Sequence, residues 1–381
     1  MPHSPIVASA RTRKQVPVMS KAHIRPLTAL RFYAAFIVFS LHASMLPGLE
    51  WLGHPQAPLQ GHLGVSVFFV LSGFIMTHVY YGDDNYVPTL ANSGRFIIAR
   101  ISRIFPLHLI TLLICLPLGL NSNTAPIQVQ NLPFHIALLQ EWSPFGFVGF
   151  GPNKVSWTLS TEMFFYLSTP IIFALMLRSG RQKILILASL FAAIAIATMY
   201  FYIEPGDPSV LVHAERAPFR LADYILGIMA FLFYQRFPTH DRSWMKWLLP
   251  LGILWFASLM AVEYYRNAPT PGSPLFLPGC LLVVLGIAFR RDTKSWFLTS
   301  DRIVFLGEAS FAFYMVHELI LRYGRQILLK LNFEIHGLLY IPWFIFVYIM
   351  IQLVANQIHL HVEIPLNTKG RKWLTKIFRL E

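Results

Sequence analysis

Residues 31–42 read R-F-Y-A-A-F-I-V-F-S-L-H, so an arginine and a histidine enclose ten residues of which only Ser40 is plainly polar. On an α-helix, eleven residues turn about 20° past three full turns. Arg31 and His42 would therefore lie on one face, about 16 Å apart along the axis. One explanation is that Arg31 extends its guanidinium to the membrane surface and His42 is an ordinary buried histidine. The other is functional, because ionisable side chains inside a membrane span usually have a role.

The composition places the chain among membrane proteins. Hydrophobic residues make up 55% of its 381 residues and charged residues only 13%, whereas soluble domains carry about 25% charged residues. The mean hydropathy is +0.53. Both cysteines, Cys115 and Cys280, fall inside apolar runs, and His54, His62 and His78 lack metal-ligand spacing. The sequence therefore predicts neither a disulfide nor a metal site.

Ten apolar runs are long enough to cross a bilayer as helices. They cover residues 26–46, 63–81, 104–120, 157–177, 184–203, 219–235, 247–264, 274–289, 303–323 and 338–358. The third run is short and contains Pro106 and Pro117. Residues 134–150 are apolar but interrupted, and we interpret them as a re-entrant or interfacial segment. The pattern predicts an all-α polytopic membrane protein with about ten transmembrane helices.

Lysine and arginine are distributed unevenly among the connections between these runs. Of the 31 such residues, 23 lie in the two terminal tails and the even-numbered loops, and seven lie in the odd-numbered loops or at the adjoining ends of the runs, while Arg31 lies in a run. Cytoplasmic loops carry the excess of positive charge, so both termini are predicted to be cytoplasmic. The net charge of +13 then reflects membrane orientation and not nucleic-acid binding.

The same pattern suggests three parts. Residues 1–24 form a polar, basic cytoplasmic tail with no evident cleavable signal peptide. Residues 25–366 form a single membrane-embedded domain, and residues 367–381 form a basic cytoplasmic tail.

A group of arginines is expected at the cytoplasmic surface. Arg100 and Arg103 are three residues apart, so they share a helix face and could join Arg31 there. A guanidinium suits phosphate because its planar fork donates two hydrogen bonds at once. The simpler explanation for Arg100 and Arg103 is that basic residues at the end of a span serve orientation and lipid head groups.

Three titratable residues from different spans are expected in the outer half of the membrane, namely His42, Glu162 and His317. His317 lies about fourteen residues, or roughly 21 Å, from the cytoplasmic end of its run, close to the depth inferred for His42. A carboxylate beside a histidine can fix its tautomer and raise its basicity, as a general base requires. Taken singly, Glu162 is also explained by a structural pair and His317 by an ordinary core histidine.

The second run carries small residues in the stretch G-H-L-G-V-S-V-F-F-V-L-S-G-F at residues 61–74. Such residues let helices approach closely, which is our leading explanation for Gly61, Gly64 and Gly73. No nucleophile elbow surrounds Ser72, so the sequence gives little support for a nucleophilic serine.

Taken in order, the motifs resemble acyltransferase family 3, whose integral-membrane members O-acylate bacterial surface carbohydrates. Arg31 and His42 resemble its Arg/Lys-x10-His signature. The other matching stretches are residues 64–74, 99–106 (A-R-I-S-R-I-F-P), 157–166 (W-T-L-S-T-E-M-F-F-Y), 306–317 (L-G-E-A-S-F-A-F-Y-M-V-H) and 362–365 (V-E-I-P). The resemblance runs from about residue 25 to 366. Departures from the family pattern are Phe311 in place of tyrosine, His108 in place of a common tyrosine, and Met163 in place of a second acid.

The resemblance implies an acyl-CoA-dependent O-acyltransferase, with acetyl-CoA or another acyl-CoA as a cytoplasmic co-substrate and no permanently bound cofactor. Arg31, Arg100 and Arg103 would bind the CoA phosphates. His42 would act as general base, with Glu162 or His317 orienting it or the acceptor. Ser72, Gly73, Trp157, Tyr166 and Tyr314 complete the candidate site, in structural or acceptor-side roles.

The resemblance also implies a location and a set of partners. The chain would be a multi-pass protein of the bacterial inner membrane, in contact with lipids and a lipid-linked or polymeric carbohydrate of exopolysaccharide or O-antigen type. Polysaccharide-assembly proteins or a second copy of the chain are compatible further partners. Two other classes stay open on the residues alone: a transporter or flippase for a glycan or acyl donor, and a structural subunit without turnover.

Overall fold

The computed structural model describes residues 24–54, 61–81, 89–120, 129–142, 151–203, 216–237, 243–266, 273–290, 294–335 and 337–380. Within these ranges the chain forms helices and turns and no strand. The predicted all-α class is therefore confirmed.

The described helices follow one another along the chain. They are α1 (Arg25–Ala43), α2 (Gly61–Met76), α3 (Leu90–Leu120), α4 (Leu132–Ile136), α5 (Trp157–Arg178), α6 (Lys183–Ile203), α8 (Ala217–Gln235), α9 (Met245–Arg266), α10 (Leu277–Ala288), α11 (Trp296–Thr299), α12 (Asp301–Glu308), α13 (Ser310–Lys330), α14 (Tyr340–Ile358) and α15 (Ile364–Ile377). Helical turns with π geometry extend α2 over Thr77–Tyr81 and join α14 to α15 over His359–Glu363.

Each of the ten predicted runs contains a helix of the structure. Seven described helical segments are long and apolar enough to cross a membrane, and the bent pair α12 and α13 would make an eighth. The helices Lys183–Thr198 and Leu277–Ala288, in the fifth and eighth runs, are apolar but shorter. The structure thus supports a polytopic membrane protein, with seven to eight spans that meet the length criterion against the predicted ten.

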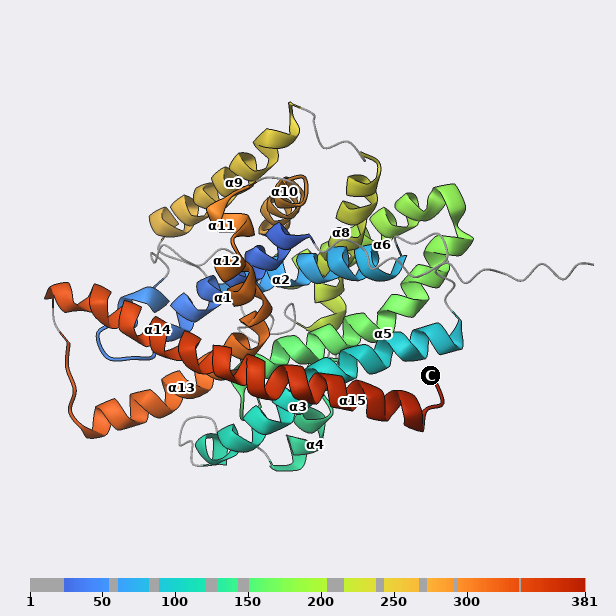
Figure 1. Cartoon of the computed structure of the whole chain (residues 1–381). Coiled ribbons are helices and arrows are strands. Elements are labelled where there is room, and N and C mark those ends of the chain that lie inside the picture. Colours follow the sequence, from blue (N-terminus) through green and yellow to red (C-terminus); the bar gives the residue numbers. More distant parts are fainter. Residues whose placement is uncertain are drawn as a thin grey trace, which may run out of the picture.

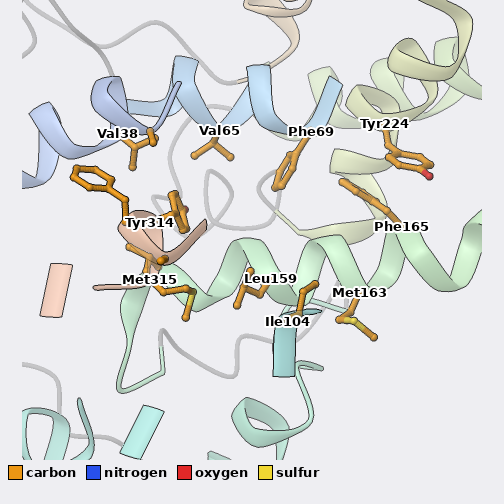
Figure 2. Packing of buried hydrophobic residues seen from close by; sticks show 14 of the residues in the cluster. Val38, Val65, Phe69, Ile104, Leu159, Met163, Phe165, Tyr224, Tyr314 and Met315 are labelled. Carbon is orange, nitrogen blue, oxygen red and sulfur yellow. The ribbon is translucent and has the colours of Figure 1, made fainter. Parts of the chain in front are cut away.

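The core lies between α1, α2, α5 and α8. The side chains of Val65 and Phe69 point from α2 toward α5 (Figure 2). The rings of Phe69 and Phe165 meet edge to face with centroids 5.1 Å apart, and Phe165 stacks on Tyr224 of α8 at 5.0 Å. Aromatic pairs of this kind contribute beyond their buried area, so this cluster fixes three helices relative to one another.

Glycines bring α2 into direct backbone contact with α8. A Cβ added at Gly73 would overlap the carbonyl oxygen of Tyr224, and one added at Gly227 would overlap that of Val70. This supports the predicted role of Gly73 in close helix approach.

At two points the boundaries of the helices differ from those of the predicted runs. Between α12 and α13 the axis bends by 62°. Beyond α14 the helix continues through its π turn into α15, and together they cross the whole molecule (Figure 1). The predicted domain boundary at residue 366 therefore falls inside a helix. Residues 134–142 of the predicted re-entrant segment form the end of the short helix α4 and turns, and residues 143–150 lie outside the described part.

The outer helices expose apolar side chains. α9 lies at the rim beside α10 (Figure 1), and only 11% of its most apolar 18-residue stretch is buried. Along α14, Ile341, Phe346 and Leu353 are more than half exposed. Apolar faces of this extent are unfavourable in water and are expected where lipid surrounds the protein.

Candidate active site

Helix α1 carries both Arg31 and His42. It starts with Pro26 in its first turn, where proline is tolerated because the missing N–H would have no intrahelical partner. It then runs without a break through Arg31 to His42. The prediction that these residues lie on one helix is confirmed, and the two ends of α1 belong to two different clusters of side chains.

The first cluster is a pair of histidines. Nδ1 of His42 lies 2.8 Å from Nε2 of His317, and the two rings are stacked with centroids 5.1 Å apart. His317 is completely buried, whereas His42 is partly exposed. The other ring nitrogen of His317, Nδ1, lies 3.2 Å from the carbonyl oxygen of Phe313.

These contacts fix the protons of a neutral pair. The carbonyl oxygen of Phe313 can only accept, so Nδ1 of His317 carries a proton and its Nε2 has a free lone pair. His42 must then donate from Nδ1, which leaves its Nε2 unprotonated. A base whose far nitrogen is oriented by a second group is the arrangement that proton abstraction requires.

Hydrogen bonds from side chains to backbone carbonyls hold α13 against the segment that precedes α5. The side-chain nitrogen of Asn153 donates to the carbonyl oxygen of Met315 at 3.3 Å, and the Arg322 guanidinium donates to that of Pro152 at 2.6 Å. Arg322 also pairs with the fully buried Glu318, at 3.5 Å. These bonds lie on both sides of His317 and so fix its height relative to α5.

The second cluster surrounds a cavity with about 750 Å³ of empty space, a figure that includes space open to solvent. Three guanidiniums, from Arg31 on α1 and from Arg100 and Arg103 on α3, line it together with one carboxylate, that of Glu162. The predicted arginine group is thus brought together in space. The remaining walls are mostly apolar and come from α2, α3, α5 and α13: Val65, Phe68, Phe69, Leu71, Met76, Ile104, Leu159 and Phe311.

Aromatic side chains hold Arg100 in place. Its guanidinium donates to the hydroxyl of Tyr80 at 3.3 Å and lies over the rings of Tyr80 and Tyr166, at 5.8 and 5.9 Å. Tyr166 in turn donates to Glu162 at 3.3 Å and bonds with Ser72. A positive group held in this way is pre-organised for an anion.

Glu162 does not join the histidines as expected. It lies in the cavity within electrostatic range of Arg31, Arg100 and Arg103, and it accepts a hydrogen bond from Tyr166. The group beside His42 is His317. The expectation that Glu162 could orient His42 is therefore corrected. The reason is that Glu162 lies one helical turn beyond Thr158, toward the arginines, and this offset depends on how α5 packs against α13.

Tyr314 lies between the two clusters. Tyr314 is one of the cavity-lining residues, and its hydroxyl lies 3.1 Å from the hydroxyl of Thr158, while its ring meets that of His317 with centroids 5.6 Å apart. Thr158 was missed by the sequence reading, although its position four residues before Glu162 places both on one helix face. Tyr80 was also missed, because its contact with Arg100 depends on the packing of α2 against α3. Trp157 begins α5 and packs edge to face on Phe69 at 6.2 Å.

Comparison with known proteins identifies the family. A model of an acyltransferase domain matches residues 25–355, which include both clusters. The chain belongs to acyltransferase family 3. The predicted membership is confirmed, and the protein is an acyltransferase of a multi-pass membrane type.

Relatives of this family come from different organisms. The chain is 29% identical to the acyltransferase MdmB of Streptomyces mycarofaciens over 328 residues, which cover 79% of this chain and 80% of MdmB. It is 27% identical to the putative membrane-bound transacylase BcsY of Komagataeibacter xylinus, over 73% of this chain and 64% of BcsY. It is 22% identical to the O-acetyltransferase OatA of Staphylococcus aureus, over 93% of this chain and 58% of OatA. No solved structure matches the chain significantly.

Proposed function

We propose that the protein is an O-acyltransferase that moves an acyl group, most simply acetyl, from cytoplasmic acyl-CoA to a hydroxyl of an exported or surface glycan at the bacterial inner membrane. The observation that carries this proposal is the histidine pair, in which His42 presents an unprotonated nitrogen while His317 holds its other nitrogen at 2.8 Å. Family membership favours an enzyme over the transporter and the structural subunit. The name of the relative OatA supports an oxygen acceptor and an acetyl group.

The donor would bind through the guanidinium cavity. Arg31, Arg100 and Arg103 would hold CoA phosphates, and the pantetheine arm would run along α1 toward His42, about 16 Å further along the helix. Glu162 and Tyr166 would keep the guanidiniums in place through the contacts described above.

At the histidine end, Nε2 of His42 takes the proton of the acceptor hydroxyl as its oxygen attacks the thioester carbon. The C–O bond forms, the C–S bond breaks, and the proton passes to the CoA sulfur, which leaves as the thiol. His317 stabilises the protonated His42 by accepting from its Nδ1. A base positioned in this way contributes about 10²–10⁴-fold.

The test is acyl-CoA consumption by the full-length protein in nanodiscs, with bacterial glycan extract as acceptor. We expect acceptor-dependent release of CoA by the wild type, none by His42→Ala, and normal release by His361→Ala, which removes an exposed histidine of the π turn. Normal turnover by His42→Ala would exclude the general-base role. Acyl-CoA binding without turnover in any glycan extract would instead favour a transporter.

A further inference from the structure

We propose that the hydroxyl of Tyr314 is the hydrogen-bond donor that stabilises the oxyanion formed on the acyl thioester during transfer. This inference rests on the proposed function and adds a catalytic residue to it.

The position of Tyr314 is the first argument. On the proposed function, the reacting thioester lies between the arginine-lined cavity and the histidine pair. Tyr314 lines that cavity, and its ring is the part of the cavity wall that contacts His317, with centroids 5.6 Å apart. The rings of Phe68 and Tyr314 meet edge to face with centroids 6.0 Å apart, so α2 also holds the tyrosine in place.

The second argument is the hydrogen bonding of the hydroxyl. The Tyr314 oxygen lies 3.1 Å from Thr158 Oγ1, and Thr158 Oγ1 also lies 2.9 Å from the carbonyl oxygen of Val155. The two hydroxyls carry one proton each, and the carbonyl oxygen of Val155 can only accept a hydrogen bond. When Thr158 donates to Val155, Tyr314 donates to Thr158. When Thr158 donates to Tyr314, the Tyr314 proton is free to point into the cavity.

The exchange between these arrangements suits an oxyanion donor. The attack breaks the C=O π bond of the thioester and places a negative charge on its oxygen. Rotation of the Tyr314 O–H toward that oxygen leaves Thr158 able to donate to the tyrosine oxygen, so one hydrogen bond is exchanged for a charge-assisted one. Donation from Thr158 also polarises the tyrosine O–H and strengthens it as a donor. When the C–S bond breaks, the carbonyl re-forms and Tyr314 can return to Thr158.

The surroundings of the hydroxyl strengthen the interaction. Tyr314 is 7% exposed and Thr158 6% exposed, and the adjoining cavity walls Val65, Phe68 and Leu159 are apolar. A hydrogen bond to a developing charge is worth more in such surroundings than in water.

The test compares Tyr314→Phe and Thr158→Val in nanodiscs with acyl-CoA and glycan extract, because both variants break the same hydrogen bond. Tyr348→Phe is the matched control, since it removes a tyrosine hydroxyl that is half-buried, donates to Gln352 at 3.1 Å and lies outside the cavity lining. We expect Tyr314→Phe to lower kcat about 10²-fold with KM for the donor unchanged, as for the loss of one oxyanion donor. Thr158→Val should lower kcat less than tenfold, because the Tyr314 proton is then always free, and Tyr348→Phe should keep the wild-type kcat.

Three outcomes would overturn the assignment. If Tyr314→Phe turns over within threefold of the wild type, the hydroxyl is not needed. If Tyr314→Phe and Thr158→Val lose activity equally, the hydrogen bond between them is structural. If the wild type fails to consume acyl-CoA, or His42→Ala consumes it normally, the proposed function fails and the oxyanion role fails with it. That result is distinguishable from the first two because it appears in variants that retain Tyr314.

Discussion

Nδ1 of His42 and Nε2 of His317 lie 2.8 Å apart although 275 positions separate the two residues in the chain. The contact joins α1 to α13, and the backbone carbonyl of Phe313 fixes the proton on the inner histidine. We expect the partly exposed His42 to act as the base and the fully buried His317 to orient it.

The two histidines should contribute unequally and should not be additive. His42→Ala removes the base itself, and we expect at least a 10²-fold loss of kcat. His317→Ala leaves the base but removes the group that orients it, so its loss should be smaller. Because the residues act as a unit, the double variant should resemble His42→Ala, as measured by single-turnover acyl-CoA consumption. Losses that multiply in the double variant would show that His317 acts independently of His42.

The guanidiniums of the cavity should affect donor binding more than turnover. Arg31→Ala removes one charged hydrogen-bonding group, worth about 1.5–3 kcal/mol, so KM for acyl-CoA should rise about tenfold or more while kcat changes less. Arg325→Ala, which removes an exposed arginine of α13, is the control and should leave KM unchanged. Steady-state kinetics at varied donor concentration gives both constants. An unchanged KM in Arg31→Ala would contradict phosphate binding by this cluster.

Gly73→Ala should destabilise the protein by disturbing the contact of α2 with α8. The added Cβ overlaps the carbonyl oxygen of Tyr224, and forced overpacking usually costs about 1–3 kcal/mol. Gly324→Ala is the matched control, because its Cβ meets only the end of Leu46 at 4.0 Å and alanine favours a helix. Thermal unfolding in detergent should show a lower Tm for Gly73→Ala alone. Equal Tm values for both variants would mean that α2 and α8 can separate at no cost.

The ion pair between Arg216 and Glu141 should be costly to break from one side. The two side chains lie 3.1 Å apart, are 0% and 5% exposed, and connect the segment after α4 to the start of α8. Arg216→Met leaves the carboxylate of Glu141 without this partner, and breaking such a pair typically costs about 3–5 kcal/mol. The double variant with Glu141→Leu should recover part of the lost Tm. A double variant less stable than Arg216→Met would show that Glu141 has a stabilising role of its own.

Much of the fold follows from local sequence. The apolar runs predict where helices form, because a long stretch without charge must satisfy its backbone hydrogen bonds internally when lipid surrounds it. The spacing of Arg31 and His42 predicts that they share one helix. The break inside the run at residues 303–323 was not predicted, because hydropathy does not reveal the 62° bend between α12 and α13.

The chemistry of the site was only partly readable. Residue types and motif order indicated which side chains matter, including His42, His317, Glu162 and the three arginines. Their grouping was predicted from depth alone, and depth does not say which neighbours touch. It placed Glu162 with the histidines, whereas the structure places it with the arginines.

By itself, therefore, the sequence determined the helical membrane class and the candidate residues, since both depend on hydropathy and on the side chains present at fixed helical spacing. Only the tertiary structure decided which residues meet. The packing of α13 against α1 makes His317 the partner of His42, and the packing of α13 against the turn Lys154–Ser156, which leads into α5, places Tyr314 beside Thr158. These contacts depend on the rotation and height of each helix relative to its neighbours, which no single segment encodes.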